Sequence, residues 1–193
     1  MRDADSYRHP RPYMLALGRL VPEKGFHQLL QAVALAGMGM DVIIAGTGPE
    51  LNYLKAVSVD LGLMDRVIFV GAADRSQVAW LHSGADWFIL PSRADEGLPL
   101  AGLEALAAGS AMIATRTGGL TEVVEDGVHA LLIDKSDVAS MAACIRPLGD
   151  DSELVAHLKS HTIEVAGALD WGGLARRYLV VIEEARALRQ THD

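Results

Sequence analysis

The segment YMLALGRLVPEKGFHQLLQAVALAGMGMDVIIAGTGP, residues 13–49, decides the fold class. It contains two short apolar runs, Tyr13–Leu17 and Asp41–Ala45, which are as long as a typical strand and lack polar alternation. Such runs are typical of strands that are buried on both faces. Between them, Phe26–Ala36 carries apolar residues three or four positions apart, which predicts a helix. The order strand, helix, strand predicts two parallel strands joined by a crossover helix.

The same alternation continues along the chain. Four more apolar runs predict strands: Val67–Val70, Trp87–Leu90, Ala111–Thr115 and Ala130–Ile133. Further helices are expected at Glu50–Leu61 and Gln77–Ser83, followed by a helical C-terminal tail at Val138–Leu148, Ser152–Ala166 and Leu174–Arg189. The pattern therefore predicts an α/β fold with a doubly wound, parallel, six-stranded, Rossmann-like sheet.

Length and composition limit the domain organisation and the compartment. A chain of 193 residues fits one domain, so we expect a tail or linker at residues 1–12 and a single domain at 13–193. The net charge of −8 argues against a nucleic-acid partner, because such binders present a basic face. A single cysteine, Cys144, cannot form an internal disulfide or a metal site. With no signal peptide and no transmembrane segment in the sequence, we expect a cytoplasmic protein.

Glycines and charged residues follow the predicted strands rather than precede them. They are Gly18-Arg19, Gly46-Thr47-Gly48-Pro49, Gly71, Arg93–Gly97 and Gly118-Gly119. In a parallel sheet these loops share the carboxyl edge of the strands, where ligands bind. The five loops are therefore predicted to form one site.

Two cations and one turn in these loops could bind a phosphate. Arg19 and Lys24 lie on the first loop, where a guanidinium fork and an ammonium could converge on an anion. The alternative is a solvated loop with two ordinary surface cations. The turn at residues 46–49 is not a dinucleotide fingerprint, because Leu51 stands where that motif needs Gly or Ala. It could equally be a strand-to-helix turn without a ligand.

Two glutamates, Glu96 and Glu104, are separated by seven residues around a predicted helix start. Gly97 and Pro99 place Glu96 on the loop and leave Glu104 within the helix that ends before Gly109. Carboxylates and free helix N–H groups suit the vicinal hydroxyls of a sugar or ribose. The alternative is two ordinary surface charges. A retaining glycosidase would also use two carboxylates, but it would leave the cations of the first loop unexplained.

The histidines give no comparable pattern. His27, His82, His129 and His157 lack metal-ligand spacing and have no neighbouring nucleophile. We interpret them as surface residues or satisfied core residues.

Taken together, the motifs resemble the C-terminal, donor-binding half of a retaining GT-B glycosyltransferase of group 1. The resemblance rests on residues 17–20, 24–25, 45–49, 67–71, 91–92, 117–124 and 126–127, in this order and at these spacings. It implies a nucleoside diphosphate sugar as donor substrate, with no cofactor and no metal.

The resemblance also implies a role for individual residues. Arg19 and Lys24 would hold the diphosphate and stabilise the leaving group, Glu96 would contact the donor sugar, and Glu104 would bind the ribose hydroxyls. The other implied donor-binding residues are Gly18, Gly46, Gly48, Val70, Gly71, Gly97, Leu98 and Leu100. Pro99 departs from the family pattern, since many relatives have Gly there, and Ala130 stands where Gly is frequent.

Enzymes of this type also have an N-terminal acceptor-binding domain. Only about 12 residues precede the first predicted strand here, which is too few for such a domain. We therefore expect half an enzyme, inactive alone, whose crossover helix Trp171–Leu188 leaves an apolar patch for the absent domain. Two alternatives remain open: a standalone nucleotide-binding or regulatory module without catalysis, and a sugar-nucleotide epimerase.

Overall fold

The structure is a computed structural model that describes residues 9–37, 39–146 and 152–168. Its strands are β1 Tyr13–Leu17, β2 Asp41–Ala45, β3 Val67–Gly71, β4 Trp87–Leu90, β5 Ala111–Thr115 and β6 Leu131–Ile133. Its α-helices are α1 Phe26–Ala36, α2 Leu51–Asp60, α3 Arg75–Gly84, α4 Leu100–Ala107, α5 Val138–Ile145 and α6 Ser152–Ala168. Two 3₁₀ helices, Pro22–Lys24 and Gly118–Glu122, lie in the loops after β1 and β5.

The six strands form one parallel sheet in the order β3-β2-β1-β4-β5-β6. The register places the carboxyl ends of neighbouring strands side by side, with Leu17 opposite Ala45 and Leu90 opposite Ala114. The strand order reverses between β1 and β4, and such a switch point opens a crevice between the two loops that leave these strands. The predicted doubly wound α/β fold is confirmed.

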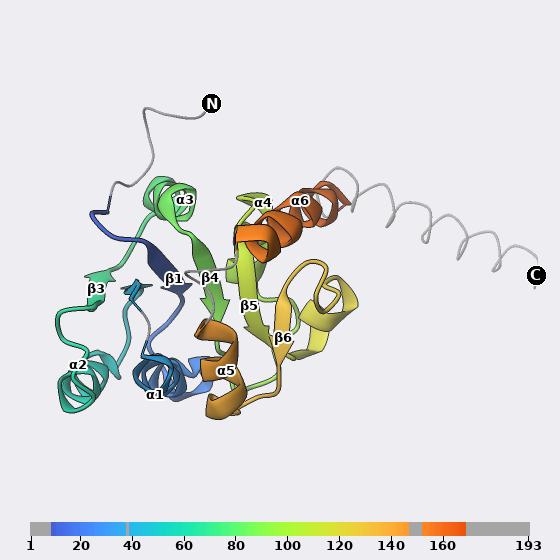
Figure 1. Cartoon of the computed structure of the whole chain (residues 1–193). Coiled ribbons are helices and arrows are strands. Elements are labelled where there is room, and N and C mark those ends of the chain that lie inside the picture. The colour runs from blue at the N-terminus through green and yellow to red at the C-terminus, as the bar shows by residue number, and fades with distance from the viewer. Residues whose placement is uncertain (1–8, 38, 147–151, 169–193) are drawn as a thin grey trace, which may run out of the picture.

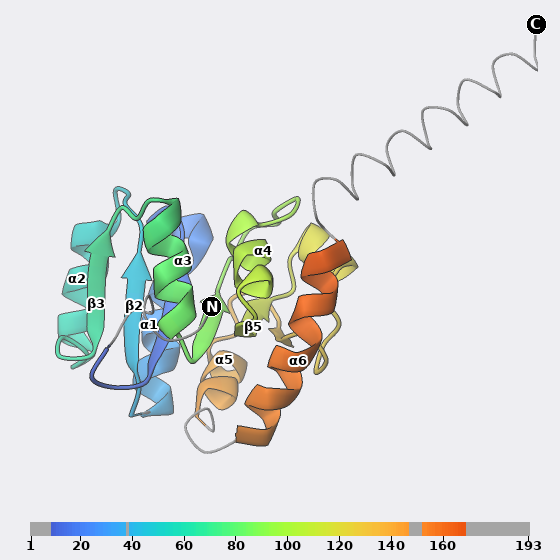
Figure 2. The same cartoon turned by 90° about the horizontal axis from the view of Figure 1, so that it is seen from above.

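Helices cover both faces of this sheet, in the layers that Figures 1 and 2 show from two directions. Met14 and Ala16 of β1 pack in the hydrophobic cluster that includes α1 and α5 residues. Their neighbours Tyr13 and Leu15 pack in the opposite cluster, with residues of α3 and α4. Because successive side chains of a strand point to opposite faces, an apolar run without alternation is what two covered faces require.

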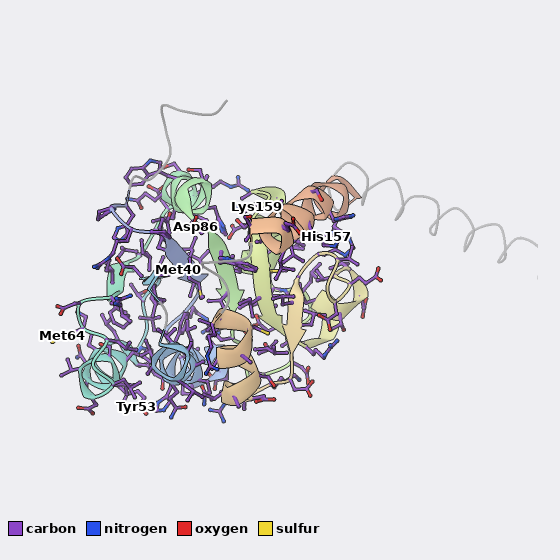
Figure 3. All side chains as sticks on the ribbon, viewed as in Figure 1. Met40, Tyr53, Met64, Asp86, His157 and Lys159 are labelled. Carbon is purple, nitrogen blue, oxygen red and sulfur yellow. The ribbon has the colours of Figure 1, made fainter. Side chains whose placement is uncertain are left out.

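Figure 3 shows the side chains and labels apolar residues in the core and on the outside of the domain. Met40, just before β2, is 5% exposed, whereas Met64 and Tyr53 lie on the outside with 65% and 47% exposure. These two outer residues lie outside both core clusters.

The chain that enters β1 is held at the amino edge of the sheet. Asp41 is fully buried, His9 Nε2 lies 2.6 Å from its Oδ2, and Arg11 Nε donates to the same oxygen at 2.9 Å. Burial alone would raise the pKa of Asp41, but the contacts with His9 and Arg11 outweigh it and hold this pKa below its ordinary value. Residues 9–12 are therefore packed on the domain.

Most predicted elements begin and end within two residues of the observed ones. β6 begins at Leu131 rather than Ala130, and α3 extends the prediction to Arg75–Gly84. Asp74 explains the earlier start, since its side chain accepts from the N–H groups of Ser76 and Gln77 in a capping box. The predicted crossover helix Trp171–Leu188 lies outside the described residues, as does the end of the helix predicted at Val138–Leu148. In the described part of the chain, no helix has the length and apolar content needed to cross a membrane.

Candidate functional site

The loops after β1 and β4 meet at the switch point of the sheet. The carbonyl oxygen of Glu23 accepts a hydrogen bond from the N–H of Arg93 at 2.8 Å. Gly25 has a left-handed φ of 71°, and a methyl group there would lie 1.9 Å from the carbonyl oxygen of Pro91. Only glycine allows both this conformation and this approach. The Lys24 backbone is consequently held directly against the chain that leaves β4.

Lys24 and Glu96 join across this junction. Lys24 Nζ lies 2.5 Å from Glu96 Oε2, and the two side chains retain only 21% and 20% of their exposure. The other oxygen, Glu96 Oε1, accepts a hydrogen bond from the hydroxyl of Ser92. Ser92 is fully buried, and its carbonyl oxygen accepts from Thr115 Oγ1 of β5 at 2.7 Å. A cation and a carboxylate, each partly exposed, are thus fixed side by side at the switch point of the sheet.

Helix α4 begins directly beside this pair. Pro99 is its N-cap and has no side-chain oxygen, so it cannot cap the N–H groups of Leu100 and Ala101 at the start of the helix. Those N–H groups, together with the helix dipole, create a positive potential that favours anions and hydroxyl oxygens. Leu98 and Leu100 flank the helix start and are 38% and 71% exposed. Pro99, the departure from the family pattern, therefore still allows a helix N-terminus to face the site.

The loop after β5 supports the Glu96 segment from the other side. The N–H of Gly119 donates to the carbonyl oxygen of Glu96 at 3.2 Å, and a methyl group at Gly119 would lie 1.6 Å from the carbonyl oxygen of Gly97. Asp95 Oδ1 accepts from Lys135 Nζ and from the N–H of Gly118. Lys135, and to a smaller extent this N–H, hold the pKa of Asp95 below its ordinary value.

The glycine turns after β1, β2 and β3 form the remaining part of the same edge. The N–H of Gly18 donates to Ala45 at 3.0 Å, and that of Gly46 donates to Gly71 at 2.7 Å. A methyl group at Gly46 would lie 1.8 Å from the carbonyl oxygen of Gly18, and one at Gly48 would lie 2.3 Å from that of Leu20. The loops after β1 and β2 therefore pack backbone against backbone, and the second of them also contacts the last residue of β3.

The structure brings together some of the predicted site residues and separates others. Lys24 and Glu96 are in contact, and Gly97, Leu98 and Leu100 follow directly along the chain. Arg19 is exposed on the loop of Lys24 and forms no ion pair within the described residues. Val70, at 40% exposure, lies at the end of the edge strand β3.

Glu104 lies within α4, as predicted, and its side chain is exposed. No hydrogen bond or ion pair connects it with Glu96 in the described part of the chain. A ligand that contacts both glutamates would have to span the start of α4. The expectation that they face one ligand stays a prediction.

Sequence reasoning missed two residues that organise the site, Ser92 and Asp95. Ser92 belongs to one of the motifs that carried the family resemblance, but nothing in the sequence shows that its hydroxyl meets Glu96 four positions later in a non-helical loop. Asp95 pairs with a lysine that follows it by 40 positions, and a single sequence does not record such a contact.

Comparisons with known proteins agree with this geometry. The family model described as glycosyl transferases group 1 matches residues 2–165. A GDP-mannose-dependent alpha-(1-6)-phosphatidylinositol monomannoside mannosyltransferase of Mycolicibacterium smegmatis is 32% identical over 93% of this chain and 50% of its own length. A D-inositol 3-phosphate glycosyltransferase of Acidothermus cellulolyticus is 34% identical over 92% of this chain and 42% of its own length. The chain thus spans half or less of the length of these relatives.

Solved structures match the fold. HepE of Anabaena in complex with UDP superposes with a TM-score of 0.81 at 26% identity, over 90% of this chain and 49% of that one. The C-terminal domain of the group 1 glycosyl transferase LpcC of Francisella tularensis superposes with a TM-score of 0.73 at 23% identity, over 82% of this chain and 87% of that domain.

The fold and the composite site at its carboxyl edge define the class, an α/β Rossmann-like domain of the GT-B glycosyltransferase type. The chain belongs to the group 1 glycosyltransferase family, and its fold matches that of the C-terminal domain of LpcC.

Proposed function

We propose that this chain is the donor-binding domain of a retaining glycosyltransferase, which transfers a sugar from a nucleoside diphosphate sugar to an acceptor held by an N-terminal domain. The observation that carries the proposal is the Lys24–Glu96 pair at the switch point between β1 and β4. A diphosphate-linked sugar needs cations at one end and hydroxyl acceptors at the other, and this pair supplies one of each within 2.5 Å.

In this proposal Arg19 and Lys24 bind the diphosphate. An ammonium has three donors, so Lys24 can keep its contact with Glu96 while it donates to a phosphate oxygen. As the bond to the sugar breaks, negative charge grows on the departing nucleoside diphosphate, and fixed cations stabilise it. Removal of one such donor typically lowers the rate by about 10² to 10³. The charge is met by side chains, so the proposed reaction needs no metal or other cofactor.

Glu96 and the start of α4 would bind the sugar, and Glu104 the ribose. The Glu96 carboxylate keeps lone pairs for sugar hydroxyls, and the N–H groups of Gly97, Leu98 and Leu100 suit hydroxyl or β-phosphate oxygens. The turns at Gly18, Gly46, Gly48 and Gly71, with Val70, would line the nucleoside side of the donor. Relatives and structural neighbours named for GDP-mannose or UDP support a nucleotide sugar as ligand class.

Donor titration of the purified chain tests the proposal. Urea unfolding with GDP, GDP-mannose, UDP and UDP-glucose as probes should show stabilisation by at least one pair, about 2.7 kcal/mol at a hundredfold excess over the dissociation constant. Lys24→Met should weaken that stabilisation, and Lys55→Met on α2, with the same change in net charge, should not. Absence of stabilisation by all four probes at millimolar concentration would overturn the proposal.

The roles of Arg19 and Glu104 need matched variants. Arg19→Ala and Glu104→Ala should both weaken nucleotide binding while the fold survives, because both side chains are exposed at the rim. Arg146→Ala at the far end of α5 and Glu153→Ala in the first turn of α6 carry the same charge changes and should bind as the wild type does. Retention would be checked on the two-domain enzyme, by comparing the anomeric configuration of donor and product by NMR.

A further inference from the structure

The Ser92 side chain is a fully buried polar group of the site. It lies two residues after the buried end of β4 and has no exposed surface. Its carbonyl oxygen accepts from Thr115 Oγ1, so its position is set by the neighbouring strand β5. A fully buried hydroxyl is stable only with a partner, and the partner here is Glu96 Oε1.

Glu96 is held by its backbone carbonyl and by both oxygens of its side chain. The N–H of Gly119 fixes its carbonyl oxygen at 3.2 Å, which leaves the side-chain torsions as the remaining freedom. Those torsions are constrained by Ser92 at Oε1 and by Lys24 at Oε2. Each carboxylate oxygen accepts about two hydrogen bonds, so the occupied lone pairs leave one on each oxygen for a ligand hydroxyl.

The two partners of Glu96 differ in how firmly they are placed. Lys24 has a long side chain with 21% of its exposure remaining, and under the proposed function it also serves the diphosphate. Ser92 has one short side-chain torsion and is packed on all sides. The rotamer of the carboxylate is therefore set mainly by Ser92.

We propose that Ser92 is a positioning residue, which orients the Glu96 carboxylate toward the sugar of the donor and takes no part in binding the diphosphate. The inference rests on the proposed function, because it assigns the sugar end of the same site. A glutamate without this hydroxyl samples several rotamers and has to be ordered by the sugar itself.

The test compares Ser92→Ala with the wild type in calorimetric titrations of two probe pairs, GDP with GDP-mannose and UDP with UDP-glucose. For the pair that binds, the affinity for the sugar donor should fall about fivefold to tenfold, the effect of one hydrogen bond. The affinity for the corresponding diphosphate should change by less than about twofold. Ser110→Ala is the matched control, since Ser110 is also buried but lies at the opposite end of β5.

A second comparison separates positioning from loss of loop structure. In a Glu96→Ala background, Ser92→Ala should cause no further loss of sugar-donor affinity, because there is no carboxylate to orient. A merely structural role would instead weaken diphosphate binding and add to the effect of Glu96→Ala. Ser92→Cys keeps the side-chain shape with a weaker donor and serves if the alanine variant does not fold; it should show the same selective loss.

The outcomes distinguish the two proposals. If the wild type binds a diphosphate and its sugar donor but Ser92→Ala loses both equally, or neither, the positioning role is overturned and the proposed function stands. If the wild type binds none of the four probes, the proposed function is overturned, and the role of Ser92 with it.

Discussion

The buried histidine His82 makes the stability of this domain depend on pH between about 4 and 6.5. His82 lies in the last turn of α3, is 3% exposed and packs against Phe88, with the ring centroids 5.1 Å apart and the ring planes tilted by 40°. Its Nδ1 lies 3.3 Å from Ser110 Oγ, and its Nε2 has no hydrogen-bond partner among the residues that the structure describes. Burial of the ring lowers the pKa of His82 from 6.5 to about 4.

The magnitude follows from this shift. The helix C-terminus favours a charged imidazole by about 1 to 2 kcal/mol, whereas a shift of this size corresponds to about 3 kcal/mol against it. Above pH 6.5 the ring is neutral in both the folded and the unfolded chain, so it adds no pH dependence. Below pH 6.5 the unfolded chain binds the proton first, and folding loses stability until the folded pKa is reached. Between pH 7 and 4.5 the expected loss from this group is about 2 kcal/mol.

Urea unfolding at pH 7 and pH 4.5 measures this loss. The carboxylates also titrate in this range, so the contribution of the ring is the difference between the wild type and His82→Asn, which keeps a polar group near Ser110 but has no titrating ring. The wild type should lose about 2 kcal/mol more than this variant. Ser110→Ala should keep the wild-type loss, because burial rather than the Ser110 contact lowers the pKa. Equal losses in the wild type and His82→Asn would refute the reasoning.

Three further predictions concern the loops and one helix. Gly119→Ala should lower the free energy of unfolding by about 1 to 3 kcal/mol, since its methyl group would overlap the carbonyl of the facing loop. Gly39→Ala is the matched control in urea unfolding, because no atom of another described residue would lie within 4 Å of its methyl group, and equal stability of the two variants would contradict the prediction. Asp74→Ala should lower the melting temperature of the domain by removing the capping box of α3, whereas Asp74→Asn should lower it less, as circular dichroism can measure. Lys135→Met should raise the pKa of Asp95 toward its ordinary value, because Lys135 is the main cause of its depression; an unchanged NMR titration would contradict this.

The fold could be predicted because its determinants are local. Each buried strand is a continuous apolar run, and the residues of Ala111–Thr115 are all buried, with neighbouring residues on opposite faces. Helix boundaries were less predictable where a side chain outside the apolar pattern sets the start. With Asp74 as its N-cap, α3 begins at Arg75, two residues before the predicted start at Gln77, because a capping carboxylate satisfies N–H groups that apolar periodicity does not register.

The site could be predicted only in part, because the sequence indicates where a residue lies along the chain but not how its side chain is oriented. Parallel strands bring their carboxyl ends to one edge, so the sequence predicts which loops meet there. It does not predict which atoms touch. Lys24 and Glu96 are 72 positions apart, and each was expected to bind the ligand directly rather than its counterpart. His82 is a second example, in the core. The burial of its ring depends on tertiary packing, which no sequence motif predicts.

The Lys24–Glu96 contact also changes what the two glutamates can do. A carboxylate that already accepts from Lys24 and Ser92 has fewer free lone pairs than an isolated one, so it can recognise hydroxyls only in a restricted set of directions. Glu104 has no such partner in the described part of the chain and stays exposed on α4. A ligand would therefore meet one glutamate whose direction is fixed in advance and one that it has to order itself. Because ordering a flexible side chain costs binding free energy, discrimination between donors should come mainly from the Glu96 end of the site, where the sugar is proposed to lie.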